Sequence, residues 1–424
     1  VEVTGIDSVM KTNGDSSVSI GGSHFGPACT GCVNATYSSG SNSYSTTCNV
    51  VGDNHDTLSC STVAGVGKDH AWVVTRSTQV SLESSGADGF VSYAAPTLDG
   101  AAPLSGAGFA DAATAGNQVI TINGTNFGPA GHSDVQVVYG PPSNRNLYTT
   151  DPCTVKAPSG GAVFQEIECR TVAGVGNDLK WKVTVGNQAT GLSSKESAYI
   201  KPVISGLSGA AAAELGSTTQ GNVIITIAGS NFGPPDGETD GNLVVTYGAD
   251  GTGYNATNCV VKDQDEIECR TQPGVGKDLK WKVNIGNQPS EVLDSPTTRY
   301  GDPTVTGITA GPFNTIGNEA IVITGTNFGV GSEQPKDPTA FFGKGAGAYT
   351  DALVSCSVTE DHFKMSCTMA EGSGLDYQVQ VEIAGQRSNA SSIDTSFGYK
   401  IPAISTVEVT GIDSVMKTNG DSSV

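Results

Sequence analysis

Apolar and polar residues alternate along short stretches of this chain. In LKWKVTV (residues 179–185), every odd-numbered residue is apolar and the others are lysine or threonine. Successive side chains of a strand point to opposite faces, so this stretch predicts a strand that buries one face in a core. Glycine-rich turns separate such stretches. The pattern therefore predicts many short strands joined by turns.

Two blocks repeat four times in the same order. The first is a strand followed by a glycine turn: SVSIGGSHFGP at 17–27, VITINGTNFGP at 119–129, IITIAGSNFGP at 224–234 and IVITGTNFGV at 321–330. The second follows later in each copy: LSCSTVAGVGKDHAWVV, IECRTVAGVGNDLKWKVTVGNQ, IECRTQPGVGKDLKWKVNIGNQ and MSCTMAEGSGLDYQVQVEIAGQ. Internal repeats of this kind indicate an array of similar structural units.

Each copy ends on Tyr, two residues and Pro, and these prolines mark the predicted joints between domains. The predicted domains are 1–96, which lacks the residues of its first strand, 97–202, 203–303 and 304–402, and 403–424 begins a further copy of the first domain. The last assignment rests on VEVTGIDSVMKTNGDSSV, which occurs identically at 1–18 and 407–424. The copied unit is thus the whole four-domain block.

These motifs resemble the IPT/TIG family, the immunoglobulin-like domain of plexins, some transcription factors and many extracellular arrays. The resemblance rests on the Gly-Thr/Ser-Asn-Phe-Gly turn, the cysteine pair, the Gly-Val-Gly turn and the closing strand, and it covers essentially the whole chain. It implies an all-β chain of four tandem seven-stranded sandwiches. Short Tyr-x-x-Pro joints, in which proline fixes one dihedral angle, predict an elongated rod.

Two copies depart from the common pattern. The first copy has Ser23 and His24 in place of Thr and Asn, and it has Arg76 where later copies have Val185 and Ile285. The fourth copy lacks both the tryptophan and the Gly-Val-Gly turn. The asparagines before Phe-Gly, which are Asn126, Asn231 and Asn327, are interpreted as turn residues that tolerate a left-handed backbone.

Composition and charge narrow the function. Fifty-six glycines and 15% charged residues favour an all-β protein, and 42 acidic against 22 basic residues give a net charge of -20. Such a surface repels nucleic acid and anionic membranes. No apolar run long enough to span a membrane occurs in the sequence. No nucleotide-binding loop and no recurring Ser/His/Asp set occurs either, so we expect no enzyme activity.

Ten cysteines predict an oxidising compartment, which means a secreted protein located extracellularly or on the cell surface. One pair falls at corresponding places in each copy: Cys48 with Cys60, Cys153 with Cys169, Cys259 with Cys269, and Cys356 with Cys367. Pairing within each domain is the simplest connectivity. Cys29 and Cys32 occur only in the first copy, and we expect a structural disulfide there, with a redox or metal-binding CxxC as the alternative.

Four Asn-x-Ser/Thr sequons predict N-linked glycans at Asn34, Asn123, Asn255 and Asn389. The competing explanation is chance occurrence in a chain rich in Ser and Thr. Asn123 is the weakest of the four, because it lies inside the repeated strand and turn.

No cofactor or metal is expected. The acidic residues Asp236, Glu238, Asp240 and Asn242 suggest a calcium loop, but Tyr247 stands where an EF-hand needs a carboxylate, so a solvated loop is favoured over an unconventional calcium site. The five histidines show no ligand spacing and are interpreted as surface or turn residues: His24, His55, His70, His132 and His362.

The leading functional hypothesis is a structural subunit of an extracellular, glycosylated filament or surface appendage, which contacts itself in a tandem or head-to-tail array. The alternative is a cell-surface adhesion or receptor ectodomain that binds a protein or an extracellular glycan, and a third is a spacer attached to an enzyme. Arrays of repeats serve either role. A filament predicts self-contacts that repeat with the four-domain period, whereas a receptor predicts monomers with one distinctive loop.

The repeated segment also raises the question of how copies join. Residue 1 falls inside a strand-forming segment, so we expect Ala-Ile-Ser-Thr to precede it in the molecule, as it precedes Val407. The alternative is a true start at Val1, with 407–424 exchanged as a strand into a neighbouring chain.

Trypsin separates these two arrangements. A continuous tandem should yield the peptide IPAISTVEVTGIDSVMK and no VEVTGIDSVMK, because every copy of the segment then follows Ile-Pro-Ala-Ile-Ser-Thr. Mass spectrometry of intact native material reads both peptides. Abundant VEVTGIDSVMK would contradict the covalent tandem and favour strand exchange.

Overall fold

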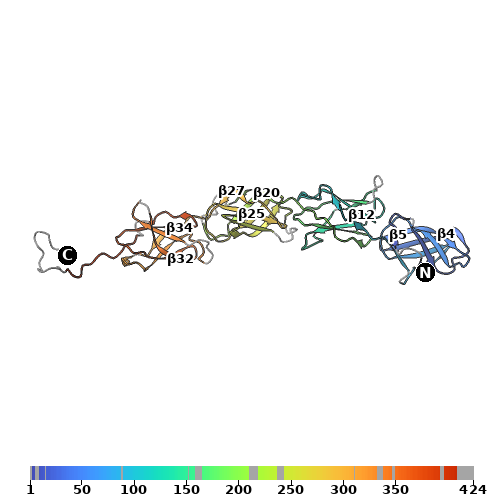
Figure 1. Ribbon diagram of the computed structural model, residues 1–424, viewed down its shortest axis with the longest axis horizontal. Helices are drawn as coiled ribbons and strands as arrows, with labels where there is room; N and C mark the ends of the chain where they lie inside the picture. Colours follow the sequence, from blue (N-terminus) through green and yellow to red (C-terminus); the bar gives the residue numbers. More distant parts are fainter. Residues whose placement is uncertain are drawn as a thin grey trace.

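The structure is a computed structural model that describes residues 2–4, 9–14, 16–86, 89–150, 152–157, 165–209, 218–235, 243–309, 311–331, 338–345, 349–391 and 396–407. The chain forms an elongated row of β-rich lobes that follow one another in sequence order, from the blue lobe at one end of the row to the orange lobe at the other (Figure 1). Every described element is a strand, so the all-β prediction is confirmed. No helix of the described residues is long and apolar enough to cross a membrane.

Four clusters of buried apolar residues follow one another along the chain, and we call the parts around them units 1 to 4. Unit 1 forms a single sheet in the order β1-β3-β6-β5-β4-β7-β9-β2, with β8 beside β7. Its strands are β1 (Glu2–Thr4), β2 (Val9–Met10), β3 (Ser17–Gly21), β4 (Cys29–Ser39), β5 (Asn42–Val51), β6 (Thr57–Ser61), β7 (His70–Arg76), β8 (Gln79–Val80) and β9 (Phe90–Tyr93). The long β4–β5 hairpin joins the two halves of this sheet.

Unit 2 forms two sheets, β10-β12-β16-β15 with β11 beside β12, and β14-β13-β17-β18. Its strands are β10 (Thr97–Leu98), β11 (Leu104–Ser105), β12 (Val119–Thr125), β13 (Val135–Gly140), β14 (Tyr148–Thr149), β15 (Thr154–Val155), β16 (Gln165–Arg170), β17 (Lys180–Val185) and β18 (Gln188–Ala189). One cluster takes Ile120 and Ile167 from the first sheet and Val137 and Val183 from the second. The two sheets therefore pack face to face as a sandwich.

Units 3 and 4 repeat this plan with the sheets β19-β20-β24-β23 and β22-β21-β25-β26, then β28-β29-β33-β32 and β31-β30-β34-β35. Unit 3 comprises β19 (Val203–Ser208), β20 (Ile224–Ser230), β21 (Val244–Gly248), β22 (Tyr254–Asn255), β23 (Thr257–Asp263), β24 (Glu266–Arg270), β25 (Leu279–Ile285), β26 (Gln288–Pro289) and β27 (Leu293–Thr298), which pairs with β25. Unit 4 comprises β28 (Thr304–Ile308), β29 (Ala320–Thr326), β30 (Thr339–Gly343), β31 (Asp351–Ala352), β32 (Val354–Glu360), β33 (Lys364–Thr368), β34 (Gln378–Ile383) and β35 (Gln386–Arg387). The units exceed the predicted seven strands because two-residue strands such as β18 and β35 close hairpins.

A stacked pair of aromatic rings lies at the centre of units 1 to 3. In unit 2, Trp181 on β17 lies opposite Tyr139 on β13, with ring centroids 4.0 Å apart and planes at 6°. The corresponding pairs in units 1 and 3 are Tyr37 with Trp72 and Tyr247 with Trp281. All three tryptophans are fully buried. The alternation seen in LKWKVTV thus places its apolar face in the core, as predicted.

Paired tyrosine hydroxyls fix the loop that precedes each Gly-Val-Gly turn. In unit 3, the hydroxyls of Tyr247 and Tyr300 lie 2.7 Å apart, the N–H of Gln272 donates to Tyr247 at 2.8 Å, and Tyr300 donates to the Gln272 carbonyl at 2.6 Å. The same pairing joins Tyr37 to Tyr93 and Tyr139 to Tyr199. Both polar groups of one loop residue are thereby satisfied inside the core.

A further tyrosine in units 1 to 3 holds the valine of the turn itself. The Tyr254 hydroxyl donates to the Val275 carbonyl at 2.9 Å and accepts from the Val275 N–H at 3.0 Å. Tyr44 makes the same two bonds to Val66, and Tyr148 makes them to Val175. Three side chains therefore hold each Gly-Val-Gly turn in one conformation.

Unit 4 lacks the stacked Tyr–Trp pair and the paired tyrosine hydroxyls of the other units. Phe342 lies opposite Val379 where the other units pair Tyr with Trp, and Asp351 occupies the position of Tyr254. Tyr399 remains, and its hydroxyl donates to the Ala370 carbonyl at 3.0 Å. The turn of unit 4 is Gly372-Ser373-Gly374, so a serine stands in place of the valine, and the Tyr377 hydroxyl donates to the Ser373 carbonyl at 2.8 Å.

We expect Tyr300→Phe to lower the free energy of unfolding of unit 3 by about 1–3 kcal/mol, because the Tyr247 hydroxyl and the Gln272 carbonyl each lose a partner inside the core. Tyr399→Phe is the matched control, and it removes a single bond from a unit without the hydroxyl pair. Amide hydrogen exchange read by mass spectrometry reports on each unit separately. Equal losses of protection in the two variants would contradict a special role for the pair.

The buried hydroxyls also predict a loss of stability at high pH. Burial raises the pKa of Tyr247 to about 12, and burial followed by the neighbouring tyrosines raises the pKa of Tyr300 as well. An unfolded tyrosine titrates near pH 10, so the stabilisation is fully present below about pH 10 and is lost as the pH rises through about 12. Phenolate absorbance at 295 nm should lag behind that of the urea-unfolded chain. Coincident curves with a native circular dichroism spectrum would disprove this expectation.

Candidate functional site

Buried side chains, close backbone contacts and hydrogen bonds come together at the joints between units. The valine of each Gly-Val-Gly turn belongs to the hydrophobic cluster of the following unit rather than to its own: Val66 to that of unit 2, Val175 to that of unit 3 and Val275 to that of unit 4. We call these residues the plug valines. Each is less than 5% exposed, so successive units share core.

Glycines of the receiving unit make room for the plug valine. A β-carbon on Gly128 would overlap Cγ1 of Val66, and one on Gly233 would overlap Cγ1 of Val175. At the hairpin between β17 and β18, a β-carbon on Gly186 would lie 2.6 Å from the N atom of Gly67 in unit 1. The backbones of adjacent units are thus in direct contact at these positions.

One glutamine per receiving unit bridges the joint. The Gln288 Nε2 donates to the Tyr199 carbonyl at 2.8 Å, while its Oε1 accepts from the Gly176 N–H at 3.2 Å. Gln386 makes the same pair of bonds to Tyr300 and Gly276, and Gln188 donates to the Tyr93 carbonyl. These bonds tie the hairpin of one unit to the turn and final strand of the unit before it.

The asparagines before Phe-Gly also act across the joint. Asn126, Asn231 and Asn327 have φ near +62°, as predicted for turn residues. Their Nδ2 atoms donate to the backbone carbonyls of Ala95, Lys201 and Asp302, which are the residues before the joint prolines. The interpretation as turn residues alone missed this second role. The signal available in the sequence was that an asparagine recurs 24 to 30 residues after each of the prolines Pro96, Pro202 and Pro303.

Threonines complete the contacts at two joints. The Thr114 hydroxyl donates to Gln264 Oε1 at 2.5 Å, and Thr219 Oγ1 lies 2.8 Å from Nδ1 of His362. Burial lowers the pKa of His362 below its usual value. Pro96, Pro202 and Pro303 are buried at the joints, so no loose linker separates the units.

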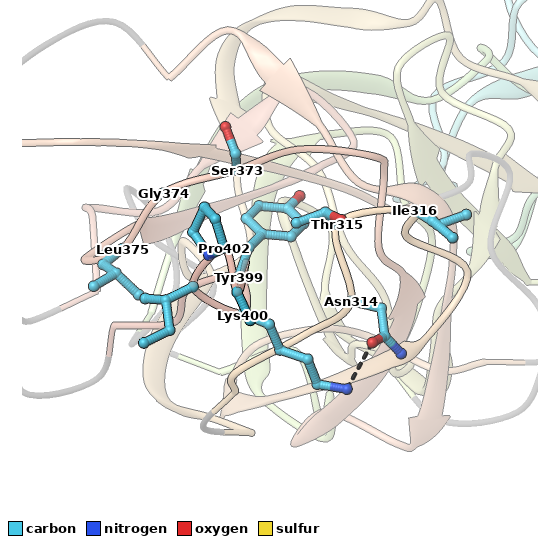
Figure 2. Close-up of a pocket in the computed structure, with 11 residues that line it drawn as sticks. Asn314, Thr315, Ile316, Ser373, Gly374, Leu375, Tyr399, Lys400 and Pro402 are labelled. Atoms are coloured by element: carbon cyan, nitrogen blue, oxygen red, sulfur yellow. Dashed lines mark hydrogen bonds between the residues drawn. The ribbon is translucent and has the colours of Figure 1, made fainter. Parts of the chain in front are cut away.

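The far end of unit 4 carries the same positions as these joints. A pocket of about 690 Å³ lies there, lined by Ser373, Gly374, Tyr399 and the residues that follow Tyr399. Figure 2 shows these side chains around the pocket, with Nζ of Lys400 bonded to Oδ1 of Asn314 at 2.6 Å. Ser373 occupies the position of the plug valines.

The outer end of unit 1 also has the form of a receiving face. Its β7–β8 hairpin carries Gln79 at the position of the bridging glutamines, and His24, with φ of 66°, stands where the other units have Asn. Arg76 takes the position of Val185, and its guanidinium donates to the carbonyls of Phe25 and Pro27. This arginine lies against Gly26, the equivalent of Gly128.

The cysteines are bonded in five pairs, Cys48–Cys60, Cys153–Cys169, Cys259–Cys269, Cys356–Cys367 and Cys29–Cys32. The first four pairs lie at the same place in the four units and join neighbouring strands or the residues beside them. The fifth lies at the start of β4.

The other predicted sites are scattered over the units. Asn34, Asn255 and Asn389 are exposed, whereas Asn123 is half-buried and its Nδ2 donates to the Ala102 carbonyl at 2.9 Å. The acidic residues considered for calcium, 236–242, lie outside the described residues. Within the described part of the chain, no group of three or more His, Cys, Asp or Glu side chains is placed to hold a metal.

The assignment of every histidine to a surface or a turn was wrong for His70. His70 is fully buried on β7, and its Nε2 lies 3.1 Å from the Val66 carbonyl. Its ring packs edge-on against Tyr37 and Tyr93, and burial lowers its pKa. It stands at the start of the strand that contains Trp72, so the core of unit 1 encloses it.

Comparisons with known proteins identify part of the chain. The IPT/TIG domain family matches residues 212–300 and 303–399. No curated protein matches the sequence. Among solved structures, the plexin A4 extracellular region is 11% identical, with 94% of this chain and 48% of that chain covered and a TM-score of 0.21. Invasin, a bacterial integrin-binding protein, is 12% identical, with coverage of 94% and 78% and a TM-score of 0.21.

A third solved structure, the FN1–FN3 domains of chicken CNTN1, is 8% identical, with 70% of this chain and 97% of that chain covered and a TM-score of 0.24. This chain spans about half the length of the plexin A4 region. The family match covers the two adjacent segments that contain most of the core residues of units 3 and 4. Residues 212–300 and 303–399 are therefore two adjacent domains of the IPT/TIG family.

Proposed function

We propose that this protein is a structural subunit of an extracellular, glycosylated filament or surface appendage. The observation that carries the proposal is the plug valine, because a side chain of one unit that completes the core of the next fixes the angle between them. An apolar residue buried in this way contributes about 1.5–3 kcal/mol. Units joined through shared cores and hydrogen bonds keep a defined angle, whereas flexible linkers behave as random coils and do not.

The proposal assigns four domains to the chain, 1–96, 97–202, 203–303 and 304–402, with 403–424 as the start of a further copy of the first domain. The four separate hydrophobic clusters support this division. The identical segments at 1–18 and 407–424 support repetition of the whole block, and so a partner that is another copy of the same unit.

The surface chemistry is consistent with an extracellular location. One bonded cysteine pair in every unit suits an oxidising compartment. Asn34, Asn255 and Asn389 are exposed, so glycans on them would extend into solvent. A net charge of -20 keeps neighbouring rods apart except where specific contacts form. The role is mechanical and involves no catalysis.

Electron microscopy of the native material tests this function. An antibody raised against the chain should decorate filaments at a regular interval that equals four units. Label on cell surfaces without filaments, together with a monomeric purified protein that binds a cell-surface protein or glycan, would overturn the proposal. That result would support the adhesion or receptor role instead.

The rigidity on which the proposal rests is testable in the full chain. Val175→Ser should weaken the joint between units 2 and 3 and reduce the maximum dimension measured by small-angle X-ray scattering, because the hydroxyl enters an apolar core. Val354→Ser is the control, since Val354 is 50% exposed and lies on β32 of unit 4, outside the joint between units 2 and 3. An unchanged scattering profile for Val175→Ser would show that the plug valine does not hold the joint.

A further inference from the structure

The outer face of unit 1 carries a complete set of receiving side chains. Gln79 corresponds to the bridging glutamines, His24 to Asn126, and His55 to His362, which has the same left-handed backbone. All three side chains are exposed, whereas Gln386 and other counterparts are wholly or partly buried against a preceding unit. This face has the hydrogen-bonding groups of a joint without covering partners in the described chain.

The end face of unit 4 carries the matching set. Thr315 corresponds to Thr114 and Thr219, and Gly374 corresponds to Gly176, whose N–H binds the bridging glutamine. Thr114 and Thr219 are 3% or less exposed, while Thr315 and Gly374 are exposed. The pocket of Figure 2 lies among these groups, next to Tyr399, the counterpart of the tyrosines whose carbonyls accept from that glutamine.

The plug valine and the space that receives it are both replaced, the first on the end face of unit 4 and the second on the outer face of unit 1. Ser373 replaces the plug valine on the end face of unit 4. On unit 1, a β-carbon on Gly26 would lie 2.6 Å from Nη1 of Arg76, whereas the equivalent β-carbon on Gly128 would meet Val66. Arg76 thus occupies, from within unit 1, the place that a plug valine from the preceding unit takes elsewhere. Ser373 and Arg76 therefore fit together at one joint, because the space beside Gly26 that a plug valine would need is already filled by Arg76.

We propose that the end face of unit 4 docks onto the outer face of unit 1 of the next copy through a joint that has no apolar plug. In this joint the Gln79 side chain hydrogen-bonds to the Tyr399 carbonyl and the Gly374 N–H. The His24 ring hydrogen-bonds to the Ile401 carbonyl, and the His55 ring hydrogen-bonds to the Thr315 hydroxyl. Ser373 lies opposite Arg76. The joint has the hydrogen bonds of the other three without their shared core, so it is the most compliant joint in each period.

We assign the partner of the end face of unit 4 to a second copy of this chain, because the sequence that follows unit 4 is the sequence that opens unit 1. The segment that follows Pro402 reaches VEVTGIDSVMKTNGDSSV, which is also the sequence that opens unit 1. The joints between units 1, 2, 3 and 4 supply the template for each contact. This inference rests on the proposed filament for its biological setting, while its geometry is testable in a recombinant chain.

The test uses a two-period chain, residues 1–406 followed by the full 424, imaged by negative-stain electron microscopy. The distribution of angles at the middle joint should be at least twofold wider than at the flanking joints. Ser373→Val in the first copy combined with Arg76→Val in the second should narrow it to the width of the others. Ser373→Val alone should not, because Arg76 still fills the place.

Docking itself is read from Gln79→Ala in the second copy, which should widen the middle joint further, with Gln188→Ala at the joint between units 1 and 2 as the matched control that retains Val66. No change on Gln79→Ala, or a middle joint as narrow as its neighbours, would overturn the inference. Neither result bears on whether native material forms filaments. Conversely, a native material without filaments would leave a compliant middle joint in the two-period chain intact.

Discussion

The rest of this architecture depends on a valine that is buried by a domain other than its own. A Gly-Val-Gly turn at a free surface would expose its side chain, as single apolar residues on protein surfaces commonly are. Here the turn is held by tyrosine hydroxyls from its own unit and covered by glycines of the next, so its position is determined from both sides. The bridging glutamine then satisfies the polar groups that this close approach would otherwise leave buried without partners.

The array is therefore a one-dimensional system in which stability resides in the units and in the contacts between neighbours. Three of its joints share an apolar core, and in each the receiving unit provides the space while the preceding unit provides the side chain. Unit 4 departs from this scheme in several coupled ways, because it lacks the tryptophan, two tyrosines and the valine together. Its turn is still held by the bond from the Tyr377 hydroxyl to the Ser373 carbonyl, so unit 4 has lost the apolar side chain of the turn and the stacked pair, and retains a tyrosine bond to the turn.

The strands and their buried faces were predictable from the sequence, because the two-residue period in LKWKVTV reads directly as a half-buried strand and its tryptophan lies in the core. The sandwich class followed from the resemblance. The contacts at the joints could not be predicted from the sequence. A valine between glycines indicates a turn, and the local sequence does not reveal that another unit covers its side chain. His70 was misjudged for the same reason: its burial is produced by Tyr37 and Tyr93, which are remote in the sequence and near only in the fold.

The direction of the plug has a consequence for biosynthesis. In every joint the inserted valine precedes, along the chain, the unit that receives it, and Val66 is translated before any residue of the sheets that enclose it. A ribosome makes the chain from the N-terminus, so each new unit emerges beside a neighbour that has already folded and presents the side chain its core requires. Folding can thus propagate along the nascent chain in one direction, with each finished unit acting as a template for the next.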